Sequence, residues 1–168
     1  MSTGVRIGQP ADREFVIQTA RRFAAFALPA WRTAHEIVGG EVRSLDDFFD
    51  GGLQSATLLV AESDGRPSGF AFLEHVTDYF SGDRHGHLGM IAVAESAEGQ
   101  GVGAALLSAA EDWARTNRYA RITLNVFEGN ERARRITPIS LETTGPGCLF
   151  RLRAGVGSST RSFGAPAN

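Results

Sequence analysis

The sequence predicts an α+β (mixed α/β) fold, in which helices flank a central mixed, mostly antiparallel sheet. The 168 residues are enough for a single domain with a sizeable core. In residues 55–93, three apolar runs of strand length are separated by short connections, and strands joined this closely pair antiparallel. A long helical pattern then separates two further strand-like runs, and a helical crossover places such strands parallel.

Composition excludes several functional classes. A net charge of −2 disfavours a broad nucleic-acid-binding face. No run approaches the roughly 18 uninterrupted apolar residues of a membrane span, so we expect no membrane partner. The single cysteine, Cys148, cannot form an intrachain disulfide and fits a reducing compartment. Because residues 1–14 also lack the layout of a signal peptide, the cytoplasm is the expected location.

The N-terminal part of the chain predicts one strand followed by helices. Residues 5–8 alternate between apolar and polar types, as in a short strand. Residues 10–26 open with a proline and acidic residues, a typical helix start, and then place apolar residues on one broad face. We expect a second helix at about 31–38 that ends at Gly39-Gly40, and a helical turn at 44–50.

The middle of the chain predicts three antiparallel strands. Residues 55–62 and 68–76 are rich in strand-forming side chains, and Asp64-Gly65 between them is a favoured hairpin turn. The next apolar run is 87–93, which follows a polar loop. Both connections are short, so each strand should lie antiparallel to the one before it.

Residues 88–117 organise the rest of the chain. An apolar strand at 88–94 leads to Gly99-Gln-Gly-Val-Gly103, and apolar residues then recur at helical spacing to about residue 116. Glycines leave backbone N–H groups uncovered and allow unusual backbone angles. Free N–H groups and the helix dipole make the start of a helix a binding site for anions. The pattern therefore predicts a phosphate-binding turn, followed by a strand at 120–127 that lies parallel to the strand before the turn.

The segment Ala97-Glu-Gly-Gln-Gly-Val-Gly-Ala-Ala-Leu-Leu107, behind Met90–Ala94, closely resembles the acyl-CoA-binding signature of the GNAT superfamily of N-acyltransferases. The family pattern is Arg/Gln-x-x-Gly-x-Gly/Ala, and Glu98 departs from it at the first position. The resemblance implies an acyl-CoA N-acyltransferase-like fold with acetyl-CoA as cosubstrate and no metal. It implies that backbone groups of Gln100, Gly101, Val102, Gly103 and Ala104 bind the diphosphate of the coenzyme. It also implies that backbone groups of Ile91, Ala92 and Val93 bind the pantetheine arm.

The reaction that the resemblance implies is transfer of an acetyl group from acetyl-CoA to a primary amine of an unidentified acceptor. An amine with a pKa near ~10 is mostly protonated at neutral pH, so a general base assists its attack. Glu74 is the first candidate for this base and His87 the second; the alternative for each is a solvated residue at a strand end. Related sequences often carry a carboxylate where Gly89 stands, so that source of a base is missing.

A second family motif is only half present. Asn130-Glu-Arg-Ala-Arg-Arg-Ile136 matches its first half, which implies that Asn130 reaches the pantetheine or its phosphate end, caps a helix, or does both. The family's tyrosine, which commonly protonates the departing thiolate, is replaced by Thr137, and Pro138 then interrupts the helix. We therefore predict impaired transferase activity with coenzyme binding partly retained. A change of reading frame near Ile136 is one hypothesis for this departure, and ordinary divergence is the other.

We expect one domain over residues 1–154, divergent from about 136, and a disordered tail at 155–168. An alternative to an active enzyme is a catalytically degenerate acyl-CoA-binding or interaction domain. Its altered sheet edge would then favour a homodimer.

A second alternative is a dinucleotide-binding oxidoreductase. Gly99–Ala104 fits the relaxed pattern G-x-G-x-x-A, and Glu128 ends the next strand as a ribose-binding acid would. Two observations count against it. Residues 94–98 separate the strand from the glycines, and the 40 residues after Glu128 are too few to complete a doubly wound sheet.

Overall fold

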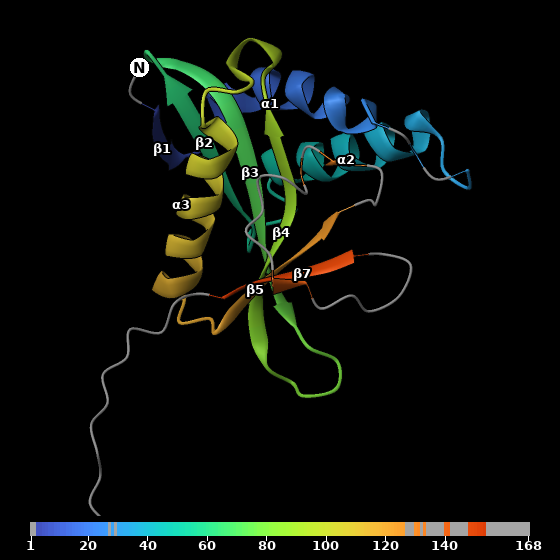
Figure 1. Cartoon of the computed structure of the whole chain (residues 1–168), viewed down its shortest axis with the longest axis vertical. Coiled ribbons are helices and arrows are strands. Elements are labelled where there is room, and N and C mark those ends of the chain that lie inside the picture. The colour runs from blue at the N-terminus through green and yellow to red at the C-terminus, as the bar shows by residue number, and fades with distance from the viewer. Residues whose placement is uncertain are drawn as a thin grey trace, which may run out of the picture.

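The protein is described from a computed structural model, which covers residues 3–26, 28, 30–126, 130, 131, 133, 140–141 and 148–153. Within these residues, seven strands form one sheet in the order β1-β2-β3-β4-β5-β7-β6 (Figure 1). Strands β4 and β5 are parallel, whereas the other neighbours pair antiparallel. The sheet confirms the predicted fold class and is not the parallel sheet that a dinucleotide-binding oxidoreductase requires. The tail predicted at 155–168 lies outside the described residues.

The predicted strands and the central helix are present with small shifts at their ends. The strands are β1 (Thr3–Ile7), β2 (Thr57–Ser63), β3 (Arg66–Thr77), β4 (Arg84–Val93), β5 (Arg121–Val126), β6 (Ser140–Leu141) and β7 (Cys148–Arg153). Helix α3 is Val102–Thr116, and a 3-10 turn, η3 (Glu95–Ala97), precedes it. The hairpin turn between β2 and β3 has positive φ at Asp64 (51°) and Gly65 (76°), as expected for that dipeptide.

The helix predicted for residues 10–26 is divided into three pieces. The 3-10 turn η1 (Pro10–Asp12) leads into α1 (Arg13–Ala20), and a second 3-10 turn, η2 (Arg21–Ala24), ends it. Asp12 accepts hydrogen bonds from the Arg6 guanidinium at 2.7 and 2.8 Å and from the Gln9 N–H at 2.7 Å. This buried carboxylate therefore joins the start of α1 to strand β1.

Helix α2 (Ala34–Phe49) is a single helix, so the predicted end at Gly39-Gly40 was wrong. Each glycine inside a helix costs about 1 kcal/mol relative to alanine. A capping box offsets part of this cost: the Thr33 hydroxyl accepts from the Glu36 N–H at 3.2 Å, and the Glu36 carboxylate accepts from the Thr33 N–H at 2.8 Å. Burial of Leu45 against the sheet stabilises the helix further. Tertiary packing thus overrides the local helix-breaking signal.

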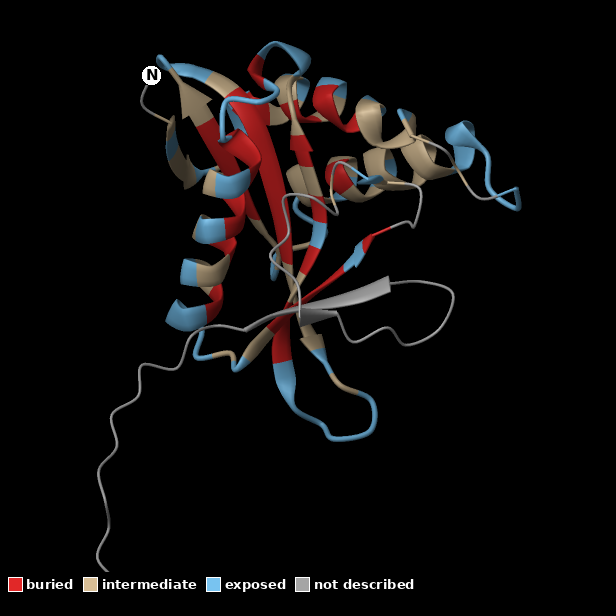
Figure 2. Ribbon diagram, in the orientation of Figure 1, coloured by how far each residue is buried: buried red, intermediate tan, exposed pale blue. Residues whose placement is uncertain are grey.

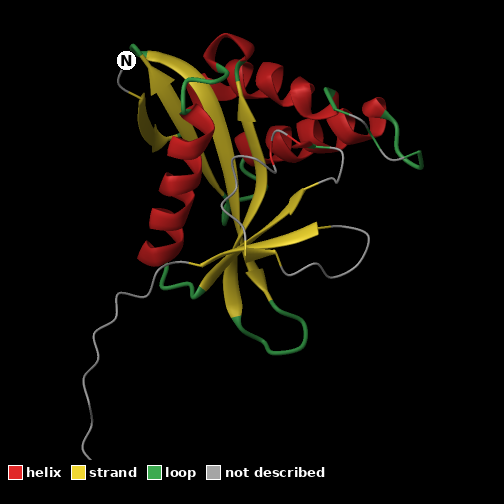
Figure 3. Cartoon of the chain, in the orientation of Figure 1, coloured by secondary structure: helices red, strands yellow, loops and turns green. Residues whose placement is uncertain are grey.

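Helices cover both faces of the sheet, and each face has its own core (Figures 2 and 3). The side chains of β3 alternate between them: Phe70 and Phe72 pack with α1 and α2, and Ala71 and Leu73 pack with α3. Gly69 lets α3 approach closely, because a Cβ there would lie 2.9 Å from Cγ1 of Val102 and 3.1 Å from Cδ1 of Leu106. The helix that carries the glycine turn is therefore seated directly on β3 and β4.

Strands β4 and β5 separate halfway along their length. Their parallel pairing runs only from Gly86–Ile122 to Leu88–Leu124, whereas β4 continues to Val93. At the point of separation β4 carries a β-bulge: Phe72 of β3 pairs with Met90 and Leu73 pairs with Leu88, so Gly89 is the extra residue. Bulges bend a strand and occur often beside functional sites. The bulge and the divergence together open the sheet from the middle.

Candidate active site

The start of α3 presents backbone N–H groups. The first intrahelical hydrogen bond runs from the Ala105 N–H to the Gly101 carbonyl at 3.0 Å, so the N–H groups of Gly101, Val102, Gly103 and Ala104 precede the helix ladder. Gly99 and Gly101 have φ of 73° and 80°, a region that favours glycine. No atom lies within 4 Å of where a Cβ would stand on either glycine. The turn is thus open to a ligand on its outer side.

Gln100 has a structural role in this turn. Its N–H donates to the Ala97 carbonyl at 3.4 Å, and its side-chain amide donates to the Ser96 carbonyl at 2.8 Å. These bonds close the loop that delivers Gly101 to the helix. A contact from the Gln100 N–H to a phosphate stays a prediction, and the four following N–H groups are better disposed for it.

A cavity of about 90 Å³ lies where β4 and β5 separate. It reaches from the α3 face of the sheet to the α2 face. Its lining comes from η2 and the residues just after it, α2, β4, α3, β5 and the segment after β5. The lining residues are Phe23, Phe26, Ile37, Glu41, Leu88, Gly89, Met90, Ile91, Leu107, Leu124, Asn125, Val126, Asn130 and Ala133. A passage of this kind suits a long, thin ligand that enters between two strands.

The β4 edge of this cavity contains Ile91, Ala92 and Val93. On one side these residues pair with Ala71, Phe70 and Gly69 of β3. On the other side the pairing with β5 has already ended at Leu88, within the described residues. Their backbone groups on that side are therefore available to an extended ligand, which would add to β4 like another strand.

Asn130 lines the same cavity and caps the helical segment that follows it. Its side-chain oxygen accepts a hydrogen bond from the Ala133 N–H at 3.1 Å. The N-cap role proposed from the sequence is thus confirmed, and a contact with a coenzyme stays a prediction. Thr137 and Pro138, at the broken part of the motif, lie outside the described residues.

Glu74 and His87 lie opposite each other on β3 and β4. The Glu74 carboxylate reaches the bulge, where one oxygen lies 2.9 Å from the position that a Cβ on residue 89 would take. Nδ1 of His87 is 2.9 Å from the Thr123 hydroxyl, and burial, with a smaller effect of His85, lowers the pKa of His87. Both candidates therefore lie on the α2 face, near the point where the strands part.

Glu41 of α2 is a further acidic residue at this place, and the sequence reasoning missed it. It lines the cavity, and burial together with the negative charge of Glu74 raises the pKa of its carboxyl group. The predicted helix end at Gly39-Gly40 left Glu41 in a loop, with no face to project from. A prediction of one continuous helix through the two glycines would have made Glu41 a candidate residue.

His75 points away from the cavity, because adjacent strand residues face opposite sides. Its Nδ1 bonds to the Tyr119 hydroxyl on the α3 face, and its ring lies 5.0 Å, centroid to centroid, from that of Trp113. Of the neighbouring pair Glu74 and His75, only Glu74 therefore belongs to the candidate site.

Comparison with known proteins decides the family. The family model of the acetyltransferase (GNAT) family matches residues 21–137, which is well over half of the chain. The chain belongs to the acetyltransferase (GNAT) family. The match contains η2, α2, the glycine turn, α3 and the diverging strands β4 and β5, so the cavity and the helix start are parts of the family's shared domain.

Solved structures support the GNAT fold at low sequence identity. PaiA N-acetyltransferase from Thermoplasma acidophilum, in complex with coenzyme A, is 18% identical with a TM-score of 0.71; the alignment covers 91% of this chain and 99% of that one. YncA from Salmonella typhimurium, a putative acetyltransferase with acetyl-CoA, is 16% identical with a TM-score of 0.66, over 97% and 100% of the two chains. A search of curated proteins found no match.

Two further properties concern the described residues of this GNAT protein. No helix there has the length and apolar character needed to cross a membrane. No group of three or more His, Cys, Asp or Glu side chains there is arranged to hold a metal ion.

Proposed function

We propose that the chain transfers the acetyl group of acetyl-CoA to a primary amine. The observation that carries this proposal is the open seam between β4 and β5, whose cavity is lined by Leu107 of α3 on one face of the sheet and by Glu41 of α2 on the other. A coenzyme bound along this seam would have its diphosphate at one end and its thioester at the other. The coenzymes in the PaiA and YncA structures support acetyl-CoA as the cosubstrate.

In this proposal each part of acetyl-CoA has its own backbone partners. The diphosphate accepts hydrogen bonds from the N–H groups of Gly101 to Ala104, where the helix dipole also favours negative charge. The pantetheine arm runs along Ile91 to Val93 and passes Asn130. The thioester then reaches the bulge at Gly89, where the Glu74 carboxylate lies against the glycine.

The acceptor amine enters from the α2 face and must lose a proton before it attacks. Of the two candidates predicted from the sequence, Glu74, which lies against Gly89, is favoured over His87 to take part in this step. The Thr123 hydroxyl occupies Nδ1 of His87, and burial lowers the pKa of its ring, which makes it a weaker base.

We also propose that turnover is reduced. Thr137 stands where family members commonly have a tyrosine that protonates the departing thiolate, and a threonine hydroxyl does not ionise in the useful range. If this loss is complete, the second function is that of an acyl-CoA-binding domain without catalysis. The gene sequence tests the reading-frame hypothesis, since a one-base shift near Ile136 must restore a tyrosine and an open frame.

Calorimetry with acetyl-CoA and a transfer assay with a panel of primary amines separate these possibilities. Binding with slow acetyl transfer supports the proposal. Binding without transfer to any amine supports the degenerate domain, and transfer at ordinary rates contradicts the predicted impairment. The mass in solution tests the proposed homodimer, and fractionation of cells tests the proposed cytoplasmic location.

A further inference from the structure

We infer that Glu41 and Glu74, which both lie at Gly89, act as one proton-accepting unit, in which Glu41 takes the proton of the acceptor's ammonium group and the neighbouring charge of Glu74 strengthens Glu41 as a base. This inference rests on the proposed acetyl transfer. It adds a catalytic residue from α2, a helix that no sequence motif marks.

Gly89 is next to both carboxylates, since it lines the cavity together with Glu41 and lies against Glu74. Glu41 lines the cavity from α2, and Gly89, Met90 and Ile91 of β4 line the same cavity. Glu74 reaches the same bulge from β3 and stands against Gly89. A Cβ at residue 89 would lie 2.9 Å from a Glu74 carboxylate oxygen, so the glycine is what allows Glu74 to occupy this place.

The electrostatics of the two acids are coupled. Burial raises the pKa of Glu41, and the charge of Glu74 raises it further, because two neighbouring carboxylates resist ionising together. Among the described residues, His87 and His85 of β4 lie on the same face of the sheet, and burial holds His87 towards its neutral form. A base is most effective when its pKa approaches the working pH, so the upward shift suits Glu41 to this task.

The reaction balances as follows in this arrangement. Ionised Glu41 takes one proton from the ammonium group and later releases it to water. The neutral amine attacks the thioester carbonyl, so that a C–N bond forms and the C–S bond breaks with its electron pair on sulfur. A second proton leaves the nitrogen as the amide forms, and the thiolate gains a proton to become the thiol. The net products are the amide, the CoA thiol and one proton.

The activity test compares Glu41→Gln, Glu74→Gln and a control, Glu14→Gln, at an exposed position of α1. The probes are acetyl-CoA with Nα-blocked lysine, whose amine has a pKa of about 10.4, and with an alanyl peptide, whose amine has a pKa of about 8. At pH 7.5, Glu41→Gln should lower kcat/KM for the lysine by ~100-fold or more, and for the peptide by less. Its affinity for acetyl-CoA should stay unchanged.

The pH profile separates a catalytic role from a structural one. With Glu41→Gln the solvent must remove the proton, so the rate should rise about tenfold per pH unit up to the pKa of the amine. Glu74→Gln should move the acidic limb to lower pH, because loss of its charge lowers the pKa of Glu41. The control should follow the wild-type profile. An unchanged profile in Glu41→Gln, with acetyl transfer intact, overturns the inference and leaves the proposed function standing.

A second measurement does not depend on activity. Carbon-13 labelling of the glutamate carboxyl groups allows both residues to be titrated by NMR. The titration of Glu41 should shift to lower pH in Glu74→Gln and stay in place in Glu14→Gln. If Glu74→Gln leaves it in place, the coupling is absent and the inference is wrong. Failure of the wild type to bind or use acetyl-CoA instead contradicts the proposed function.

Discussion

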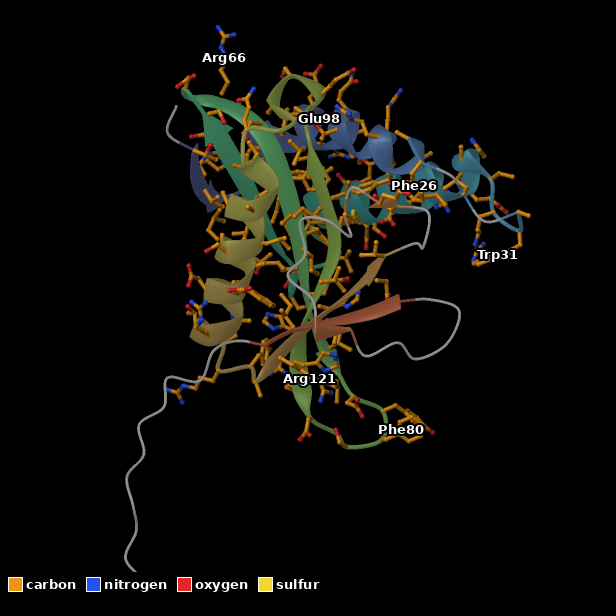
Figure 4. All side chains as sticks on the ribbon, in the orientation of Figure 1. Phe26, Trp31, Arg66, Phe80, Glu98 and Arg121 are labelled. Carbon is orange, nitrogen blue, oxygen red and sulfur yellow. The ribbon has the colours of Figure 1, made fainter. Side chains whose placement is uncertain are left out.

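The carboxylate of Glu98, at the entry to the glycine turn, forms an ion pair with the guanidinium of Arg22 from η2. Glu98 stands where the GNAT pattern has arginine or glutamine, so its negative charge would oppose a phosphate bound at the start of α3 (Figure 4). Arg22 neutralises this charge. The second guanidinium nitrogen, Nη1, is buried without a hydrogen-bond partner among the described residues. Arg22 thus places a guanidinium group near the turn, although it comes from a different part of the chain.

Removal of Arg22 should therefore weaken coenzyme binding. We expect Arg22→Ala to lower the affinity for CoA by about two- to fivefold, since a partly exposed ion pair contributes about 0.2–1 kcal/mol. Arg22→Ala/Glu98→Gln should recover most of this loss, because the uncompensated charge is gone. Arg115→Ala, which removes a paired arginine at the other end of α3, is the control. Calorimetry in low salt measures these values, and equal effects of Arg22→Ala and Arg115→Ala would contradict this account.

Gly101 should not tolerate a side chain. Its φ of 80° lies in the region that costs other residues about 1–2 kcal/mol, although there is open space around it. Gly101→Ala should lower stability by about 1 kcal/mol and weaken CoA binding as the turn relaxes. Gly4→Ala is the matched control, since it also has open space but no positive φ. Thermal unfolding with and without CoA compares the two, and equal melting temperatures would refute the role of the turn's geometry.

Gly69 is needed for a different reason, which is the close packing of β4 and α3 against it. A Cβ at this position would lie 2.8 Å from the Ala92 carbonyl oxygen and 2.9 Å from Cγ1 of Val102. Backbone cannot give way as a flexible side chain can, so Gly69→Ala should destabilise the protein by about 1–3 kcal/mol. Urea unfolding, again with Gly4→Ala as the control, tests this. A variant with wild-type stability would mean that α3 is not held as described.

His75 should make stability depend on pH. Burial, and secondarily the charge of Arg84, lowers its pKa below the unfolded value of about 6.5. The unfolded chain then binds more protons, so this contribution is complete above pH 6.5 and is lost as the pH falls towards the folded pKa. His87, whose pKa is also lowered, acts with the same sign. Between pH 5.5 and 7.5, His75→Gln should show a flatter dependence of unfolding free energy than wild type, and an unchanged slope would exclude the effect.

The sequence predicted those parts of the fold that local patterns determine. Strand β4, the glycine turn and α3 follow from apolar periodicity and glycine spacing, and the parallel β4–β5 pair follows from the crossover between them. Helix α2 did not follow, because its two glycines signal an end that burial of Leu45 and the Thr33 cap override. That single error removed Glu41 from the list of candidate residues.

The candidate site also has a part that the sequence predicted and a part that it did not. The backbone groups of Gly101 to Ala104 could be predicted, since a helix start exposes N–H groups whatever surrounds it. The cavity could not, because it arises from the bulge at Gly89 and from strands that part after Leu88. Strand register and divergence depend on contacts between distant segments, and no local pattern in the sequence records them.

The most direct test follows the backbone amides of the turn by NMR while CoA is added. The account predicts that the amide resonances of Gly101, Val102, Gly103 and Ala104 shift together and saturate at one CoA per chain. If CoA at millimolar concentration leaves these four resonances unmoved, the start of α3 does not bind the diphosphate, and the proposed acetyl transfer is contradicted.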